Sequence, residues 1–275
     1  MNSPSIEIPK RRNPFIPQKP NSEIWLPPHG QIHPAQAAPF GILLRYGGRK
    51  FMPTDIPGLA LWLDPSDATS VTIDAGAVSA LADKSGNGRH FTQATPANRP
   101  VISAAGFGGV NALSFTSANS QYLEGPSFAA LTAAESLIVL EMTAGETAAT
   151  HALWHFGSAV DAEFFTFAGA IFDAFGSTVR KGVGPPVPDH TVLADPSLFN
   201  VISTAAEYTA SVNGVELFTT AINTVGWDIV SYLGKNNGTT YFDGFVGEVL
   251  IYDHELTAQE LAMLTAYLQI KWGVP

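Results

Sequence analysis

Short apolar runs, four to eight residues long and separated by turn signals, fill the sequence after about residue 56 and constrain the fold most. Runs of this length between glycines, prolines and asparagines are typical of β-strands rather than helices. They predict an all-β body, built as a sandwich or jelly roll. The clearest runs are Leu137–Met142, Ala152–Phe156, Phe164–Phe167, Leu198–Ser203, Ile229–Leu233 and Phe245–Tyr252.

The pair Asn213-Gly214 lies between Glu207–Val212 and Val215–Thr220 and predicts a β-hairpin. Both residues tolerate positive φ, which the type I′ turn requires. A two-residue loop also fixes which residues face each other across the two strands. The expected pairs are Val212 with Val215, Ala210 with Leu217, and Tyr208 with Thr219.

One helix is expected, at the C-terminal end of the sequence. Thr257 and Glu260 have the spacing of a capping box, in which each side chain accepts from the other residue's backbone N–H. An apolar stripe follows, and Gly273 stands where such a helix would end. The stripe, which should cover one edge of the sandwich, consists of Leu261, Leu264 and Leu268.

The composition excludes several kinds of site. The chain has no cysteine, which rules out disulfides, thiolate zinc sites and a cysteine nucleophile. No stretch approaches the roughly 20 apolar residues that span a bilayer, so no membrane partner is expected. Prolines and charges occupy residues 1–12, where a secretory signal would be apolar, so no ordinary signal peptide is expected.

Residues 1–55 differ from the remainder in charge and proline content. Residues 1–52 hold seven Lys/Arg and two acidic residues, whereas residues 53–275 hold seven basic and 22 acidic residues. Eleven prolines within residues 1–57 favour extended backbone, with one strand expected over residues 41–46. We predict an arm (1–55) that anchors a body (56–275) to another surface; the alternative is a solvated tail. The expected anchoring residues are Lys10, Arg11, Arg12, Phe15, Lys19, Trp25 and Arg45.

Three segments of the body, Gly58–Asp67, Ser79–Gly88 and Phe242–Asp253, carry a resemblance to a known family. Together with the Asn213-Gly214 hairpin and the final helix, they resemble the LamG-like jelly-roll domains of the concanavalin A-like lectin/glucanase superfamily. Such domains occur in phage structural and bacterial surface proteins. The resemblance covers about residues 56–275 and implies an all-β, concanavalin A-like jelly-roll sandwich with one C-terminal helix. It says little about function, because the fold carries lectins, adhesins, enzymes and structural modules.

No catalytic residue is expected, and the chain is predicted not to be an enzyme. Glucanases of the superfamily use a Glu-x-Asp-x-x-Glu pattern, which is absent from this sequence. The nearest acidic pair, Asp161 and Glu163, lacks a third acid at the required spacing. His151 and His155 lie in a run that reads as a strand, without the glutamate of a zincin motif.

Calcium is the one cofactor to consider, because many lectin-like jelly rolls hold it at one rim. The alternative is that these Asx residues only form turns, and no segment resembles an EF-hand loop. The weak candidates for ligands are Asp64, Asp67, Asp83 and Asp243.

Aromatic side chains that lie on the surface beside hydrogen-bonding groups are a common way to bind sugars. Their alternative is ordinary packing in the core. The candidates for glycan binding are Trp154, Trp227, Tyr232 and Tyr241.

The main functional hypothesis is a structural protein of a phage particle, such as a capsid decoration protein or a head or tail accessory protein. Its arm would bind other virion proteins, and homo-oligomers are expected. It would be assembled in the host cytoplasm and reside in the virion. The alternative is a carbohydrate-binding adhesin that contacts host surface glycans, and the third hypothesis is a glycoside hydrolase. No nucleic-acid partner is expected, because the body is acidic and no binding motif occurs.

Overall fold

The computed structural model describes residues 23–26, 43–46, 48–159, 164–167, 170–183 and 190–275. Contacts divide the chain into two units, Met1–Lys50 and Phe51–Pro275. Each unit is considered by itself.

The first unit contains a three-stranded sheet in the order β1-β2-β3. β1 (Glu23–Leu26) pairs in parallel with β2 (Leu43–Tyr46), and β2 pairs antiparallel with β3 (Arg49–Lys50). β2 lies within the segment 41–46, where a strand was expected. The register of β1 and β2 places Trp25 opposite Arg45.

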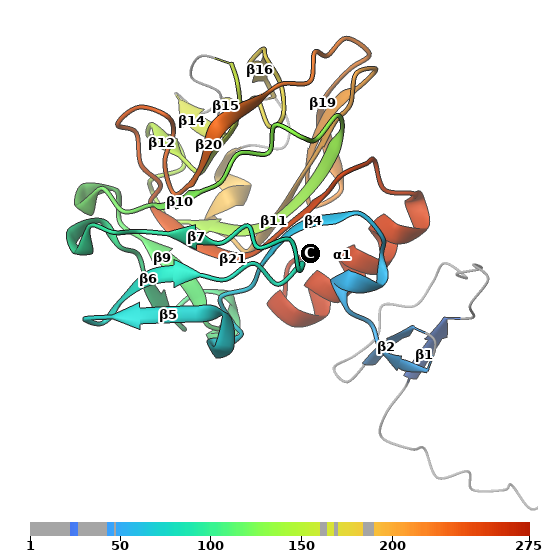
Figure 1. The fold of residues 1–275 in the computed structure, drawn as a ribbon, viewed down its shortest axis with the longest axis horizontal. Helices are drawn as coiled ribbons and strands as arrows, with labels where there is room; N and C mark the ends of the chain where they lie inside the picture. Colours follow the sequence, from blue (N-terminus) through green and yellow to red (C-terminus); the bar gives the residue numbers. More distant parts are fainter. Residues whose placement is uncertain (1–22, 27–42, 47, 160–163, 168–169, 184–189) are drawn as a thin grey trace, which may run out of the picture. The chain divides into compact units, whose positions relative to one another are not determined.

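An eight-stranded antiparallel sheet forms one layer of the second unit (Figure 1). Its order is β19-β18-β17-β11-β21-β9-β8, and β4 pairs with β21 beside this path. The long strands β11 and β21 lie in the middle of this sheet, and nearly all their residues are buried. The strands are β4 (Leu59–Leu63), β8 (Val101–Ser103), β9 (Ala112–Phe115), β11 (Ala134–Met142), β17 (Ser197–Ser203), β18 (Tyr208–Val212), β19 (Val215–Thr220) and β21 (Gly244–Tyr252).

A six-stranded antiparallel sheet forms the opposing layer, in the order β13-β20-β10-β7-β6-β5. Its strands are β5 (Val71–Asp74), β6 (Ala77–Leu81), β7 (Phe91–Thr92), β10 (Leu123–Gly125), β13 (Trp154–Gly157) and β20 (Trp227–Leu233).

The hydrophobic core lies between these two sheets. Trp154 of β13 and Phe199 of β17 bring their rings to 5.7 Å from opposite layers. Leu81, Phe91 and Leu123 of the six-stranded sheet join the same buried cluster as Ile138 of β11. The predicted all-β sandwich is therefore confirmed, since inward residues of two antiparallel sheets interdigitate in one core.

A smaller four-stranded sheet has the order β12-β14-β15-β16. Short 3-10 helices connect several strands of the body. The strands of this sheet are β12 (His151–Ala152), β14 (Phe165–Phe167), β15 (Ala170–Asp173) and β16 (Lys181–Gly182). The 3-10 helices are η1 (Pro53–Asp55), η2 (Ala68–Ser70), η3 (Pro96–Asn98), η4 (Phe107–Gly109), η5 (Ser117–Asn119) and η6 (His190–Ala194).

The predicted hairpin is present, but its register is only partly as expected. Asn213 and Gly214 have φ of 51° and 75°, as the turn requires, and Val212 faces Val215. Because of a register shift between Ala210 and Ser211, the other two pairs differ from those expected. Ala210 faces Phe218 rather than Leu217, and Tyr208 faces Thr220 rather than Thr219. The extra residue of a β-bulge accounts for the shift, and the turn sequence carries no signal of it.

The C-terminal helix α1 (Ala258–Trp272) has the predicted ends. Thr257 accepts a hydrogen bond from the Glu260 N–H, and the Glu260 carboxylate accepts from the Thr257 N–H. Gly273 ends the helix with φ of 70°. The buried face is broader than the leucine stripe: Leu264 and Leu268 are buried, whereas Leu261 is half-buried. Met263, Tyr267 and Trp272 complete this face.

Within the residues that the structure describes, no helix is long and apolar enough to cross a membrane.

Candidate functional site

The outer face of the six-stranded sheet carries a row of polar and aromatic side chains. In β20, Ser231 and Leu233 point into the core, so Tyr232 between them points outward. Strand register places Tyr232 opposite Glu124 of β10 on one side and His155 of β13 on the other. Because directly opposite residues share a face, these three side chains lie on the same face of the sheet, where Glu124 and Tyr232 reach the surface and His155 is buried.

Three tyrosines and one lysine gather at this face; we call Tyr122, Tyr232, Tyr241 and Lys235 the tyrosine cluster. The ring of Tyr122 lies 5.8 Å from that of Tyr232 and 6.3 Å from that of Tyr241. The Lys235 ammonium lies 4.7, 4.4 and 5.9 Å from the ring centroids of Tyr122, Tyr232 and Tyr241. This geometry is a cation–π arrangement with three rings around one charge.

Backbone contacts hold the cluster in place. Lys235 and Tyr241 form an isolated antiparallel bridge at the two ends of a short loop. The carbonyl oxygen of Tyr241 accepts from the Ala152 N–H and lies 3.0 Å from Nδ1 of His151. The Tyr122 N–H donates to the Asn98 carbonyl. Backbone hydrogen bonds to neighbouring segments therefore fix the positions of Tyr122 and Tyr241.

The polar ends of the tyrosine cluster are available to a ligand. All four side chains are half-buried. Among the described residues, neither the Lys235 ammonium nor any of the three phenol hydroxyls has a hydrogen-bond or ion-pair partner. Burial lowers the pKa of Lys235, while nearby Glu124 opposes that shift. Burial also raises the pKa of Tyr232, so its hydroxyl stays protonated and able to donate.

A buried histidine lies beside Tyr232 on the neighbouring strand. The ring of His155 lies 6.0 Å from that of Tyr232 and is fully buried. Its Nε2 lies 2.8 Å from Oδ2 of Asp228 on the neighbouring strand. His151, the other histidine of the sequence pair, instead has Nε2 3.0 Å from Oε2 of Glu146. The two histidines therefore have separate acidic partners.

The structure corrects two of the four predicted glycan-binding residues. Trp154 is fully buried, and its Nε1 donates to Oδ1 of Asp173 at 2.8 Å inside the core. Trp227 is 9% exposed, donates from Nε1 to the Leu131 carbonyl, and packs its ring against Phe175. Neither indole offers a free face, because the two sheets bury both. Tyr232 and Tyr241, by contrast, are brought together at the surface.

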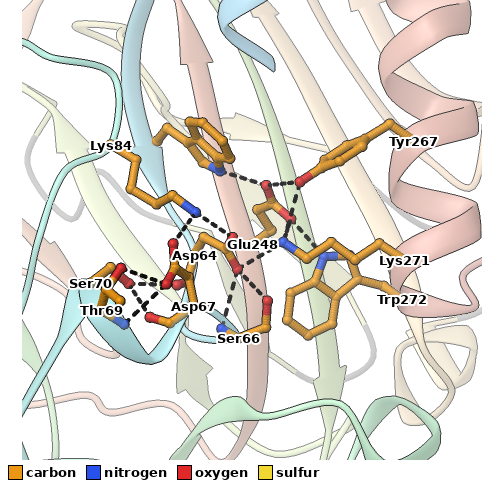
Figure 2. A network of polar contacts seen from close by, with 11 residues as sticks. Asp64, Ser66, Asp67, Thr69, Ser70, Lys84, Glu248, Tyr267, Lys271 and Trp272 are labelled. Atoms are coloured by element: carbon orange, nitrogen blue, oxygen red, sulfur yellow. Dashed lines mark hydrogen bonds and ion pairs between the residues drawn. The ribbon is translucent and has the colours of Figure 1, made fainter. Parts of the chain in front are cut away.

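Two calcium candidates belong to a network of charges at the C-terminal end of α1, shown in Figure 2. The carboxylate of Asp64 contacts Lys84 at 2.9 Å and Lys271 at 2.8 Å, and Asp67 contacts Lys84 at 2.8 Å. Burial acts to raise the pKa of Asp64, but Lys271 and Lys84 lower it below its usual range. Both carboxylates therefore form ion pairs with lysine ammonium groups. An ammonium group is positively charged and has no lone pair with which to coordinate a cation.

Glu248 is the centre of the same network (Figure 2). It is fully buried on β21 and accepts hydrogen bonds from four side chains. Burial raises its pKa, and Lys271 opposes this shift. The donors are Trp62 Nε1 at 2.6 Å, Tyr267 Oη at 3.0 Å, Lys271 Nζ at 2.6 Å and Trp272 Nε1 at 2.8 Å. Three of these donors belong to α1 and Trp62 belongs to β4, so the network holds the helix against the sheet.

The other calcium candidates also accept from protein donors. Asp83 forms the Asx turn that its sequence predicts, accepting from the Ser85 N–H at 2.9 Å. Asp243 accepts from the N–H and hydroxyl of Ser117 and from the hydroxyl of Thr143. In the described part of the chain, no group of three or more His, Asp or Glu side chains converges as a metal site would require.

Several of the predicted site residues lie outside the residues that the structure describes. Asp161 and Glu163, the weak hydrolase candidates, fall in the gap at 160–163. Of the anchoring residues, Trp25 and Arg45 are register partners in β1 and β2. The others, Lys10, Arg11, Arg12, Phe15 and Lys19, lie outside the described residues.

Sequence reasoning missed Tyr122 and Lys235. Tyr122 precedes β10 and lies more than a hundred positions from Tyr232, so only strand pairing brings the two together. Lys235 follows the run Ile229–Leu233 by two residues, and its position is set by the bridge to Tyr241. The alternation of inward Leu123 and outward Glu124 was the one available local signal.

No protein-family model matches the chain, and neither does any curated protein sequence. Among solved structures, the fold is similar to the ligand-binding domain of botulinum neurotoxin serotype D determined with N-acetylneuraminic acid. The TM-score is 0.56 at 10% identity, covering 79% of this chain and 54% of that one. It is also similar to the receptor-binding domain of botulinum neurotoxin mosaic serotype C/D, with TM-score 0.57, 10% identity and coverage of 82% and 55%.

A third similar structure is the binding domain of Paraclostridial Mosquitocidal Protein 1. Its TM-score is 0.52 at 11% identity, covering 82% of this chain and 56% of that one. The chain spans about half the length of these three structures. At such low identity the likeness concerns the β-sandwich fold alone.

Proposed function

We propose that this chain is a non-enzymatic carbohydrate-binding protein and that the tyrosine cluster is its sugar-binding surface. The observation that carries the proposal is the gathering of three half-buried tyrosines around Lys235, with their polar ends unpaired among the described residues. Two of these tyrosines, Tyr232 and Tyr241, are among the four glycan-binding candidates predicted from the sequence.

The chemistry of the cluster suits a saccharide. A pyranose ring presents C–H groups on one face, which pack on aromatic rings, and hydroxyls at its edge, which need donors and acceptors. Each phenol supplies a donor and an acceptor, and the lysine ammonium supplies further donors. A rigid aromatic floor with a few polar groups at its rim is the usual composition of a small-molecule site.

The fold comparisons support the same class of function. The serotype D neurotoxin domain with a similar sandwich was determined in complex with N-acetylneuraminic acid. The mosaic C/D domain is described as receptor-binding. These are properties of those proteins; for this chain they favour glycan binding over the other hypotheses derived from the sequence.

A glycan array with the full chain tests the proposal, followed by calorimetric titration of the best saccharide. We expect Tyr232→Ala and Lys235→Ala each to weaken binding about tenfold or more, a loss of roughly 1.4 kcal/mol. Matched controls are Lys181→Ala and Ile229→Ala. Lys181 lies 5.7 Å from the Tyr208 ring elsewhere in the body, and Ile229 is an 84% exposed residue of the same strand β20. Equal binding by all four variants would contradict the assignment.

A structural role in a virus particle, with residues 1–55 as anchor and other virion proteins as partners, is a second proposal that rests on the sequence alone. It is compatible with glycan binding, because a displayed module can also contact host glycans. The deletion experiment given below tests it separately.

A further inference from the structure

A polar cavity lies where β4 begins and β21 ends. Its volume is about 370 Å³. It shares no residue with the tyrosine cluster. The lining residues that matter here are Gly58, Ala60, Ser85, Asn87, Arg89 and Asp253.

Arg89 is held rigidly at the wall of this cavity. Its Nη1 donates to the Ala60 carbonyl at 2.6 Å, and its guanidinium carbon lies 5.1 Å from the centroid of the Phe128 ring. Its backbone N–H donates to Oδ2 of Asp83 at 2.9 Å. The guanidinium is therefore stacked and fixed at one edge, which leaves its other N–H groups for a further partner.

The turn that carries Arg89 is fixed as well. Asp83 is buried and accepts hydrogen bonds from the backbone N–H groups of Trp62, Ser85 and Arg89. Nδ2 of Asn87 donates to the Leu59 carbonyl at 2.9 Å. These bonds tie the turn to β4, so the cavity wall is organised before any ligand arrives.

Arg89 has no carboxylate partner in the part of the chain that the structure describes. Among the residues described, no ion pair joins its guanidinium to an acidic side chain, whereas Arg99 pairs with Asp74 at 2.6 Å. A planar guanidinium recognises a carboxylate through two parallel N–H···O bonds. The cavity thus offers a positioned cation that forms no ion pair with an acidic side chain of the described residues.

Asp253 supplies the opposite charge in the same cavity. Its backbone N–H donates to the Gly58 carbonyl at 2.9 Å, and its side chain is 52% exposed. Oδ1 lies 3.0 Å from Nδ1 of His254. A carboxylate here accepts hydrogen bonds from a ligand's hydroxyl or amino group and repels a second negative charge.

We propose that this cavity binds a small carboxylate whose neighbouring carbon bears a hydrogen-bond donor, with Arg89 holding the carboxylate and Asp253 the donor. A 2-hydroxy acid and an α-amino acid share this chemistry. The inference is independent of sugar binding at the tyrosine cluster, because it rests on other residues.

The test is a titration of the full, isotope-labelled wild-type chain with lactate, alanine and propionate at millimolar concentration, followed by NMR. These three molecules have the same carbon skeleton and differ only in the group beside the carboxylate. We expect the amide signals of Gly58, Ser85 and Arg89 to shift, with lactate or alanine binding more tightly than propionate. The absence of shifts with all three, or equal affinity for all three, overturns the proposal. The tighter of lactate and alanine identifies the class of ligand.

Variants then assign the two roles. We expect Arg89→Gln to weaken binding about tenfold or more. Arg89→Lys should weaken it less, because the ammonium keeps the positive charge but cannot form two parallel N–H···O bonds to the carboxylate. Asp253→Asn should reduce the advantage of alanine over propionate. Arg180→Gln, at an exposed arginine outside the cavity, and Tyr232→Ala, in the tyrosine cluster, should bind as wild type does. Wild-type affinity in Arg89→Gln overturns the assignment.

Discussion

The carboxylate of Glu248 contacts the ammonium of Lys271 at 2.6 Å, although the glutamate side chain is fully buried in the body. This ion pair joins the middle of β21 to the last turn of α1 (Figure 2). A buried charge is tolerated only where a counter-charge and hydrogen bonds replace the lost water. Glu248 has both, so the pair explains how the C-terminal helix is fastened to the eight-stranded sheet.

Removal of this carboxylate should destabilise the body strongly. Glu248→Leu leaves the indole N–H groups of Trp62 and Trp272 without their acceptor and leaves Lys271 with Asp64 as its one carboxylate partner among the described residues. We expect a loss of about 3–5 kcal/mol in the free energy of unfolding, measured by urea denaturation. The control is Glu216→Gln, at an exposed glutamate of β19, with a change below about 0.5 kcal/mol. A loss below about 1 kcal/mol for Glu248→Leu would show that the network contributes little.

A second buried glutamate should make stability fall as pH rises. Glu135 of β11 is fully buried, and its burial raises the pKa to about 7, against opposing hydrogen bonds from Leu256 and Asn200. A raised folded-state pKa means that the contribution is fully present below the unfolded value of 4.5 and is lost as pH rises through about 7.

We therefore expect Glu135→Gln to flatten the pH dependence of the free energy of unfolding between about pH 5 and about pH 8. The difference from wild type across that window should be roughly 3 kcal/mol. Asp173, whose pKa burial raises to about 6, contributes with the same sign in both proteins, so it cancels from the comparison. Parallel pH curves for the two proteins would disprove the role of Glu135.

The hairpin turn allows two effects at one residue to be separated. Asn213 has φ of 51°, and its Oδ1 accepts from the Leu198 N–H at 2.8 Å. Asn213→Ala loses the bond and also strains the backbone, for which we expect a loss of about 2 kcal/mol; Asn213→Gly loses only the bond, and we expect about half as much. Thermal unfolding measures both. Equal losses would mean that the positive φ carries no cost.

Residues 51–275 should fold without the preceding segment. Among the described residues, those of the main hydrophobic core lie between Ala60 and Ile251. We expect a chain lacking residues 1–50 to unfold cooperatively, with a midpoint close to that of the full chain, as measured by circular dichroism. In the proposed virion role, the same deletion would abolish incorporation into particles. Normal incorporation of the truncated chain would contradict that role.

Local sequence signals predicted the parts of this fold that depend on neighbouring residues. The Asn213-Gly214 turn, the Thr257 cap and the Gly273 end are examples, because each is determined within a few positions. The register shift between Ala210 and Ser211 and the burial of Trp154 could not be predicted from local sequence, for a common reason. Both depend on which strands pair and which sheets pack, and these relationships join residues far apart in the chain.

The candidate site shows the same limit. Aromatic content pointed to Tyr232 and Tyr241, but it pointed equally to Trp227, which packs in the core. Only the register of β20 with β10 and the bridge from Lys235 to Tyr241 reveal one shared surface. Tyr122 enters the site by that register alone.

The most direct test of the account follows the ring signals of the seven tyrosines by NMR while the best saccharide from the array is added. We expect the rings of Tyr122, Tyr232 and Tyr241 to shift together with one affinity. We also expect the rings of the buried Tyr208, Tyr252 and Tyr267 not to change. A saccharide that binds tightly yet leaves the three cluster rings unperturbed would contradict sugar binding at the tyrosine cluster.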